Sequence, residues 1–321
     1  AAAGAAQAFG CGAGGLYLSS GKRHRWRMTD QTKGLLLTFF GVMCIVPEAL
    51  FVRVIDAPML TLAFWKVTLV GLAIGTGLLL AQGTAPFRAL RRAGWASAIY
   101  VGGVACAGVG FVLAVRLTSV ANVVFILASL PVFAAIYSKV FLGEPISRRM
   151  FFTIAAVLAG LAVIAFGSGE TENASRAGDL LALSISAIFA GALTAARHAR
   201  AVSMVPAVAL AYLLAGAVLL PVAQPLQMPA AELPQMLLYA VFMAASAGLI
   251  ALGPRYISSA EVGLLVLLES VLAPLLVWAV LGEDPSIYAL IGGGIVVGAL
   301  FLSNLIALSR RRRVVPPLPH H

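Results

Sequence analysis

Residues 116–147 read RLTSVANVVFILASLPVFAAIYSKVFLGEPIS, and residues 255–286 read RYISSAEVGLLVLLESVLAPLLVWAVLGEDPS. Both stretches begin with arginine, continue as an apolar run and end with Leu-Gly-Glu followed three residues later by serine. The same offset of 139 residues also gives the identical pairs Ser119–Ser258, Ala121–Ala260, Tyr100–Tyr239 and Leu113–Leu252. This many identities at one offset indicate an internal duplication of the chain.

The composition is that of a membrane protein. Hydrophobic residues make up 61% of the 321 residues, charged residues only 11%, and the mean hydropathy is +1.00. A soluble chain of this size does not have such a composition. Apolar runs near or above the roughly 18 residues that cross a bilayer recur along the sequence. The net charge of +10 does not indicate a nucleic-acid partner, because the basic residues lie between the apolar runs.

The apolar runs predict ten membrane-spanning helices. The expected spans are 34–52, 58–82, 93–115, 117–142, 150–167, 178–196, 204–223, 235–252, 256–281 and 287–308. The chain then divides into a basic N-terminal tail (1–33), a first five-helix repeat (34–167), a second five-helix repeat (178–308) and a basic C-terminal tail (309–321). The polar connection 168–177 separates the two copies.

The basic residues predict how these spans are oriented. With the N-terminus inside, 18 of the 22 Lys and Arg residues face the cytoplasm and three, Arg53, Arg116 and Arg176, face outward, while Lys66 lies within a span. Both termini are therefore expected inside. Five spans per copy is an odd number, so the copies must cross the bilayer in opposite senses. The predicted fold is all-α, with ten transmembrane helices in a 5+5 inverted repeat.

Inverted repeats are typical of transporters, in which two related halves move about a central site. The alternative is a duplicated scaffold without a transport role. Ten spans, with Leu-Gly-Glu-x-x-Ser before the last span of each half, resemble the drug/metabolite transporter superfamily, EamA branch, and most closely the bacterial YddG-type aromatic amino-acid exporters. Pro58 with Lys66 eight residues later is similar to that family's second span, where arginine is common in place of the lysine. The second half has no basic counterpart after Pro206. The resemblance implies transport of small organic solutes through a cavity lined by spans one to four and six to nine.

Polar residues recur at helical spacing on two spans. Ser119, Asn122, Ile126, Ser129 and Phe133 form one stripe on span four, and Ser258, Glu261, Leu265 and Glu269 form a similar stripe on span nine. Glu269 lies about midway along its span, where an ionised carboxylate costs about 2.5–3.5 kcal/mol and should therefore face protein or water. These residues either line the solute pathway or make interhelical hydrogen bonds, which contribute about 0.6 kcal/mol on average.

Trp65 and Lys66 lie near the centre of span two. A lysine at this depth must reach a carboxylate, a backbone carbonyl or a hydrated cavity. It could receive the carboxylate of a solute, with Trp65 offering a face to an aromatic ring. The alternative is a structural ion pair between Lys66 and either Glu48 or Glu269.

Small residues and prolines predict packing and bending of the spans. Gly103, Ala107 and Gly110 follow Tyr100 on one face of span three, and we expect this face to pack against a neighbouring helix. The same is expected of Gly71-x-x-x-Gly75 and of Gly294-x-x-x-Gly298. Pro131 and Pro274 interrupt spans four and nine at different positions in the two copies, so they should act as unequal hinges.

No metal-binding spacing, nucleotide-binding loop or catalytic dyad occurs in the sequence, so neither a metal nor another cofactor is expected. We therefore expect a non-enzymatic secondary transporter of the plasma (inner) membrane that exports small organic solutes, above all amino acids and preferably aromatic ones, by alternating access. Its partners are the solute and the lipid bilayer, and the oligomeric state stays open. The alternatives are a membrane enzyme acting on lipid and a non-transporting scaffold. The candidate solute-binding residues are Trp65, Lys66, Tyr100, Asn122, Phe125, Phe189, Tyr212, Ser246 and Glu269, of which Phe125 and Phe189 could equally face lipid.

Overall fold

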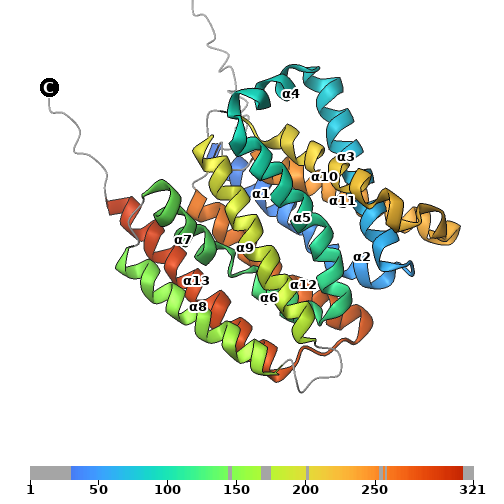
Figure 1. Ribbon diagram of the computed structural model, residues 1–321. Helices are drawn as coiled ribbons and strands as arrows, with labels where there is room; N and C mark the ends of the chain where they lie inside the picture. Colours follow the sequence, from blue (N-terminus) through green and yellow to red (C-terminus); the bar gives the residue numbers. More distant parts are fainter. Residues whose placement is uncertain are drawn as a thin grey trace, which may run out of the picture.

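Every regular element in the described part of the chain is helical (Figure 1). The computed structural model describes residues 30–143, 147–167, 175–199, 202–252, 256 and 259–313. The helices of the first copy are α1 (Asp30–Ile45), α2 (Glu48–Val54), α3 (Met59–Gln82), α4 (Ala85–Leu90), α5 (Trp95–Leu117), α6 (Val120–Leu127), α7 (Leu130–Leu142) and α8 (Arg148–Gly167). Those of the second copy are α9 (Arg176–His198), α10 (Val205–Ala223), α11 (Leu233–Leu252), α12 (Ser259–Leu281) and α13 (Ile287–Arg313). Short 3₁₀ turns occur at η1 (Arg91–Ala93), η2 (Pro225–Gln227) and η3 (Ala230–Glu232).

Long apolar helices correspond to the predicted spans. Within the described residues, nine segments are long and apolar enough to cross a membrane, and α12 contributes a further apolar stretch over Leu265–Leu281. The predicted all-α membrane fold is therefore confirmed. Span one consists of α1 and α2, a break that the sequence analysis did not predict, and span four consists of α6 and α7, where Pro131 was predicted to interrupt the span.

Proline explains both breaks. Pro47 directly precedes α2, and Pro131 is in the first turn of α7. Proline has no N–H for the bond to the carbonyl four residues back, and its ring also crowds that carbonyl. In span four the chain makes tight turns at this point, through bonds from Ser129 N to Ile126 O and from Val132 N to Ser129 O. The two copies differ at this point, because span four is divided near Pro131 whereas α12 runs through Pro274 without a break.

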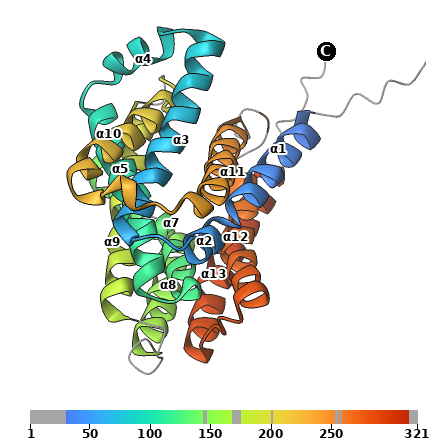
Figure 2. The ribbon, with the colours of Figure 1, turned by 90° about the vertical axis from the view of Figure 1, so that its right-hand side faces the viewer.

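Pairs of packed helices follow the duplication. Helix α1 packs on α11 and α5 packs on α9, so the first span of each half contacts the third span of the other. The second spans pack on each other as α3 and α10, the fourth as α6 and α12, and the fifth as α8 and α13. Exchanging the two halves maps this set of pairs onto itself. Figures 1 and 2 show the resulting bundle, in which α8 and α13 lie side by side along one flank.

The backbone conformation explains why both copies of Leu-Gly-Glu contain a glycine. Gly143 follows α7 with φ of 69°, and Gly282 follows α12 with φ of 68°. This left-handed conformation ends helices and is disfavoured for residues that carry a Cβ atom. Span four and its counterpart, span nine, therefore end with the same backbone geometry.

Small residues bring helices together, with one exception to the prediction. A Cβ atom on Gly71 would lie 3.0 Å from Leu213 N of α10, and one on Gly103 would lie 2.7 Å from the Ala192 Cβ atom of α9. These two packing predictions are confirmed. The prediction for Gly294 and Gly298 is wrong within this chain, because a Cβ atom on either would meet nothing within 4 Å and both glycines are exposed.

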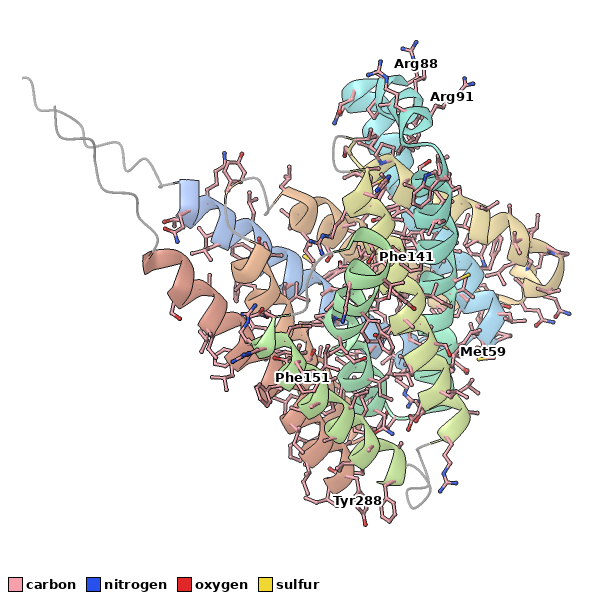
Figure 3. The ribbon with its side chains drawn as sticks, turned by 60° about the vertical axis from the view of Figure 1, so that its left-hand side comes forward. Met59, Arg88, Arg91, Phe141, Phe151 and Tyr288 are labelled. Atoms are coloured by element: carbon pink, nitrogen blue, oxygen red, sulfur yellow. The ribbon has the colours of Figure 1, made fainter. Side chains whose placement is uncertain are left out.

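Labelled residues mark the two ends of the bundle. Figure 3 shows Arg88 and Arg91 at one end and Tyr288 near the opposite end. We call these the Arg88 end and the Tyr288 end. The predicted cytoplasmic side corresponds to the Arg88 end, and the orientation in the bilayer stays a prediction.

Candidate functional site

A buried ion pair lies at the junction of four helices. Lys66 Nζ on α3 is 2.6 Å from Glu48 Oε1, at the first residue of α2, and it donates a hydrogen bond to Gly108 O of α5 over 3.1 Å. The side chains of Lys66 and Glu48 are only 3% and 10% exposed. Of the two alternatives for Lys66 that the sequence left open, the ion pair with Glu48 is the arrangement present.

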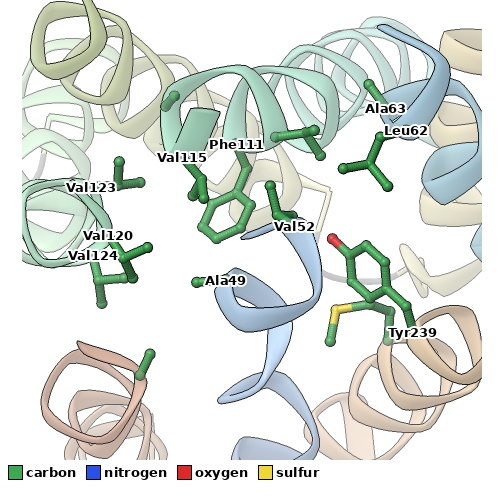
Figure 4. Packing of buried hydrophobic residues seen from close by; sticks show 14 of the residues in the cluster. Ala49, Val52, Leu62, Ala63, Phe111, Val115, Val120, Val123, Val124 and Tyr239 are labelled. Carbon is green, nitrogen blue, oxygen red and sulfur yellow. The ribbon is translucent and has the colours of Figure 1, made fainter. Parts of the chain in front are cut away.

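Aromatic rings surround this pair. The Lys66 ammonium lies 5.0 Å from the Phe111 ring centroid and 6.0 Å from that of Tyr239, within the range of cation–π attraction. The Tyr239 hydroxyl donates to Glu48 Oε1 over 3.2 Å, and the Tyr239 ring stacks on Phe51 with centroids 5.3 Å apart. Figure 4 shows Phe111 and Tyr239 on either side of α2. Glu48, Lys66, Gly108, Phe111 and Tyr239 are called the Glu48–Lys66 site below.

The site joins both copies of the repeat. Helices α2, α3 and α5 belong to the first copy, and α11, which carries Tyr239, belongs to the second. Helix α10 of the second copy also reaches the site, because a Cβ atom on Gly108 would lie 2.6 Å from Tyr212 Cε1. Only glycine allows the Tyr212 ring this close to the backbone whose carbonyl binds Lys66.

Burial of this pair is energetically costly. Removing either partner of a buried ion pair typically destabilises a protein by about 3–5 kcal/mol, whereas apolar residues in place of both are often neutral or stabilising. Ionisable residues inside membrane spans are rare, and they often mark a solute or ion pathway. The arrangement can present a cation and an anion side by side to a solute.

Three predicted aromatic residues gather beside the site. Tyr100 of α5 belongs to a buried apolar cluster between α3, α5, α9 and α10, and Phe189 and Tyr212 pack against the same cluster. Trp65 is held differently, because its indole Nε1 donates to Pro225 O in η2 over 3.1 Å. Its ring is half-buried and anchored to the connection between α10 and α11.

Asn122 lies in a different polar contact, between α6 and α9. Its Nδ2 is 3.1 Å from both carboxylate oxygens of Asp179, and Thr118 Oγ1 donates to Asp179 Oδ1 over 2.7 Å. Seven residues further along spans four and six, Ser129 Oγ, at the start of α7, and Ser186 Oγ of α9 are 3.2 Å apart. The polar stripe of span four therefore contacts α9, and its hydrogen bonds join helices.

The remaining candidates are on α6, α11 and α12. The Phe125 ring packs directly on Gly293 of α13. Ser246 is buried on α11. Glu269 is half-buried on α12, which packs on α2. Ser258, the Glu261 side chain and Glu144 lie outside the described residues.

The sequence interpretation missed a charged network near the Tyr288 end. Arg53 Nε at the end of α2 is 3.1 Å from Glu283 Oε2, and Arg53 Nη2 donates to Glu283 Oε1 over 3.1 Å and to Thr118 O over 2.9 Å. Glu283 Oε1 also accepts from Val120 N at the start of α6 over 3.0 Å. We call this the Arg53–Glu283 network. The repetition of Glu144 at 283 was the available signal, since a glutamate kept in both copies indicates a specific partner.

Nearby, Arg116 Nη2 donates to Ile55 O over 2.6 Å and thereby ties the end of α5 to the chain after α2. The network and this bond connect α2, α5, α6 and the α12–α13 connection at one end of the bundle. For metals, no cluster of three or more His, Cys, Asp or Glu side chains occurs among the residues that the structure describes.

Comparison with known proteins matches both copies to one family. The EamA-like transporter family matches residues 32–166 and again residues 176–305. Thirteen chains of solved structures match, and one of them, described only as a crystal structure of a protein, is 20% identical with a TM-score of 0.59. That alignment covers 88% of this chain and 99% of the other, and at this identity it shows a shared fold alone. Among the curated proteins there is no match.

Proposed function

The chain belongs to the EamA-like transporter family, whose members are non-enzymatic transporters of small solutes, and from this premise we propose that it exports amino acids, preferably aromatic ones. The proposal places it in the plasma (inner) membrane with the Arg88 end in the cytoplasm. It includes the finer likeness to the YddG-type aromatic amino-acid exporters. The described fold, with two five-span copies packed against each other, is the architecture that alternating access uses.

The observation that carries this proposal is a buried cation surrounded by aromatic rings. Lys66 can bind the carboxylate of a solute, and Phe111 and Tyr239 lie within 6.0 Å of its ammonium group. An aromatic side chain next to the carboxylate would find rings for offset stacking or edge contacts, which are worth about 0.5–1.5 kcal/mol beyond the area buried. Tyr100, Phe189 and Tyr212 extend the aromatic surroundings toward α9 and α10.

Alternating access requires that each end of the bundle opens in turn. At the Tyr288 end, the Arg53–Glu283 network holds the two copies together. It joins α2 and α6 of the first copy to the α12–α13 connection of the second. We infer that the structure represents a state closed at the Tyr288 end.

A flux screen tests the proposal. The full chain is reconstituted in liposomes, and uptake of each labelled amino acid is measured with and without a proton gradient. We expect uptake of aromatic amino acids to exceed that of protein-free liposomes and to fall by at least about tenfold in Lys66→Met, because a charged hydrogen bond to the solute is lost. If no amino acid enters faster than into protein-free liposomes, the proposed solute class is wrong.

A further inference from the structure

We propose that Glu48 and Lys66 together form the binding site for the head group of a zwitterion, so that transport selects solutes carrying both an ammonium and a carboxylate group. In this inference, the solute carboxylate replaces Glu48 on Lys66, and the solute ammonium replaces Lys66 on Glu48. The inference rests on the proposed function, since that function supplies the solute. It adds Glu48 as a specificity-determining residue.

Charge balance is the first argument. The pair is buried and neutral as a unit, with its two charged atoms 2.6 Å apart. A solute with only a carboxylate would compensate Lys66 and leave Glu48 without its counterion, and an amine would do the opposite. An uncompensated charge in a site of low polarity is strongly unfavourable. A zwitterion separates the pair and compensates both residues, so the net charge of the site stays zero.

The second argument is that each charged group keeps a fixed partner while its counterion is exchanged. The Tyr239 hydroxyl donates to Glu48, and the Gly108 carbonyl accepts from Lys66. The rings of Phe111 and Tyr239 also attract the ammonium group. These contacts come from α5 and α11, the helices that flank the pair, and none of them requires the direct bond between Glu48 and Lys66.

The third argument is the position of Glu48 in the chain. It is the first residue of α2, directly after Pro47, where span one is interrupted. A break in the helical hydrogen bonding is where a small change of backbone angles can move one segment relative to the next. Rotation of α2 about this break would separate Glu48 from Lys66 without disturbing α3.

Competition by analogues that lack one charge tests the inference on the parent protein. Uptake of labelled phenylalanine into proteoliposomes is measured against unlabelled phenylalanine, phenethylamine, which lacks the carboxylate, and 3-phenylpropionate, which lacks the ammonium. We expect each singly charged analogue to compete at least about tenfold more weakly than phenylalanine, because each leaves one charge unpaired. Equal competition by all three compounds would overturn the inference while leaving amino-acid transport intact. Absence of phenylalanine uptake altogether would instead refute the proposed function and, with it, the site.

A neutral version of the pair provides the second test. Glu48→Gln/Lys66→Met removes both charges, so no unpaired charge remains buried and the protein is expected to purify as a single species. We expect its phenylalanine uptake to fall at least about tenfold. Uptake at the parent rate with the parent preference would show that the pair only joins helices. The matched control neutralises the other described ion pair, Arg53→Met/Glu283→Gln, which should alter rates for all solutes alike and leave the preference for zwitterions unchanged.

Discussion

Replacement of Asn122 by alanine should destabilise the fold by an amount that depends on Asp179. In the structure the Asn122 amide donates to both oxygens of the buried Asp179 carboxylate, which also accepts a hydrogen bond from Thr118. Hydrogen bonds to charged groups contribute about 1.5–3 kcal/mol, so Asn122→Ala should lower the free energy of unfolding by about 2 kcal/mol. If Asn122 were a solute ligand instead, stability would hardly change and solute affinity would fall by roughly threefold to tenfold.

A double-mutant cycle separates these possibilities. In an Asp179→Asn background the carboxylate is replaced by a neutral amide, and Asn122→Ala should then cost only about 0.5–1.5 kcal/mol, typical of a neutral hydrogen bond. Unfolding is followed in mixed micelles by the loss of helical signal as the denaturing detergent increases. Ser129→Ala is the control at the same α9 interface, and its loss of a neutral contact should cost about 0.6 kcal/mol. Equal costs of Asn122→Ala in both backgrounds would refute the assigned contact.

Three further perturbations have defined outcomes. Gly108→Ala should lower the free energy of unfolding by about 1–3 kcal/mol, because the new Cβ atom would lie 2.6 Å from the Tyr212 ring. The control is Gly77→Ala, whose Cβ atom would meet nothing within 4 Å and which should leave stability unchanged in the same unfolding assay. If the Glu269 carboxylate, which lies about midway along its span, exchanges protons during transport, Glu269→Gln should flatten the pH dependence of flux. An unchanged profile in a folded variant would exclude this role. A cysteine at Glu283, on a background without native thiols, should react with an impermeant reagent outside intact cells, and labelling only after permeabilisation would contradict the predicted orientation.

The span pattern was predictable because bilayer thickness sets the length of an apolar helix. The duplication was equally visible, since it preserves Leu-Gly-Glu and the glycine must adopt a left-handed conformation at 143 and 282. The break in span one was not predicted, because hydropathy stays high across Pro47, whereas Pro131 was predicted to interrupt span four. A proline can bend or divide a helix, and tertiary packing decides between the two.

The partners of the charged and polar residues could not be predicted from the sequence. Lys66 was identified from the cost of a cation at mid-span, but Glu48 and Glu269 were equal as partners until the fold placed α2 beside α3. Helical spacing showed that Asn122 belongs to a polar face without showing that α9 covers this face. The pairing of Arg53 with Glu283 joins residues 230 positions apart, a contact that a local pattern does not contain.

Cross-linking across the Arg53–Glu283 network tests alternating access most directly. Cysteines replace both residues in a chain whose Cys11, Cys44 and Cys106 are serine, and a short, reducible bis-thiol reagent joins them in proteoliposomes. The double-cysteine variant without cross-links should transport phenylalanine, because the Tyr288 end of the bundle can still open. Cross-linking should abolish this flux, and reduction should restore it. Undiminished flux through fully cross-linked protein would contradict the account, since the solute would then cross without opening of the Tyr288 end.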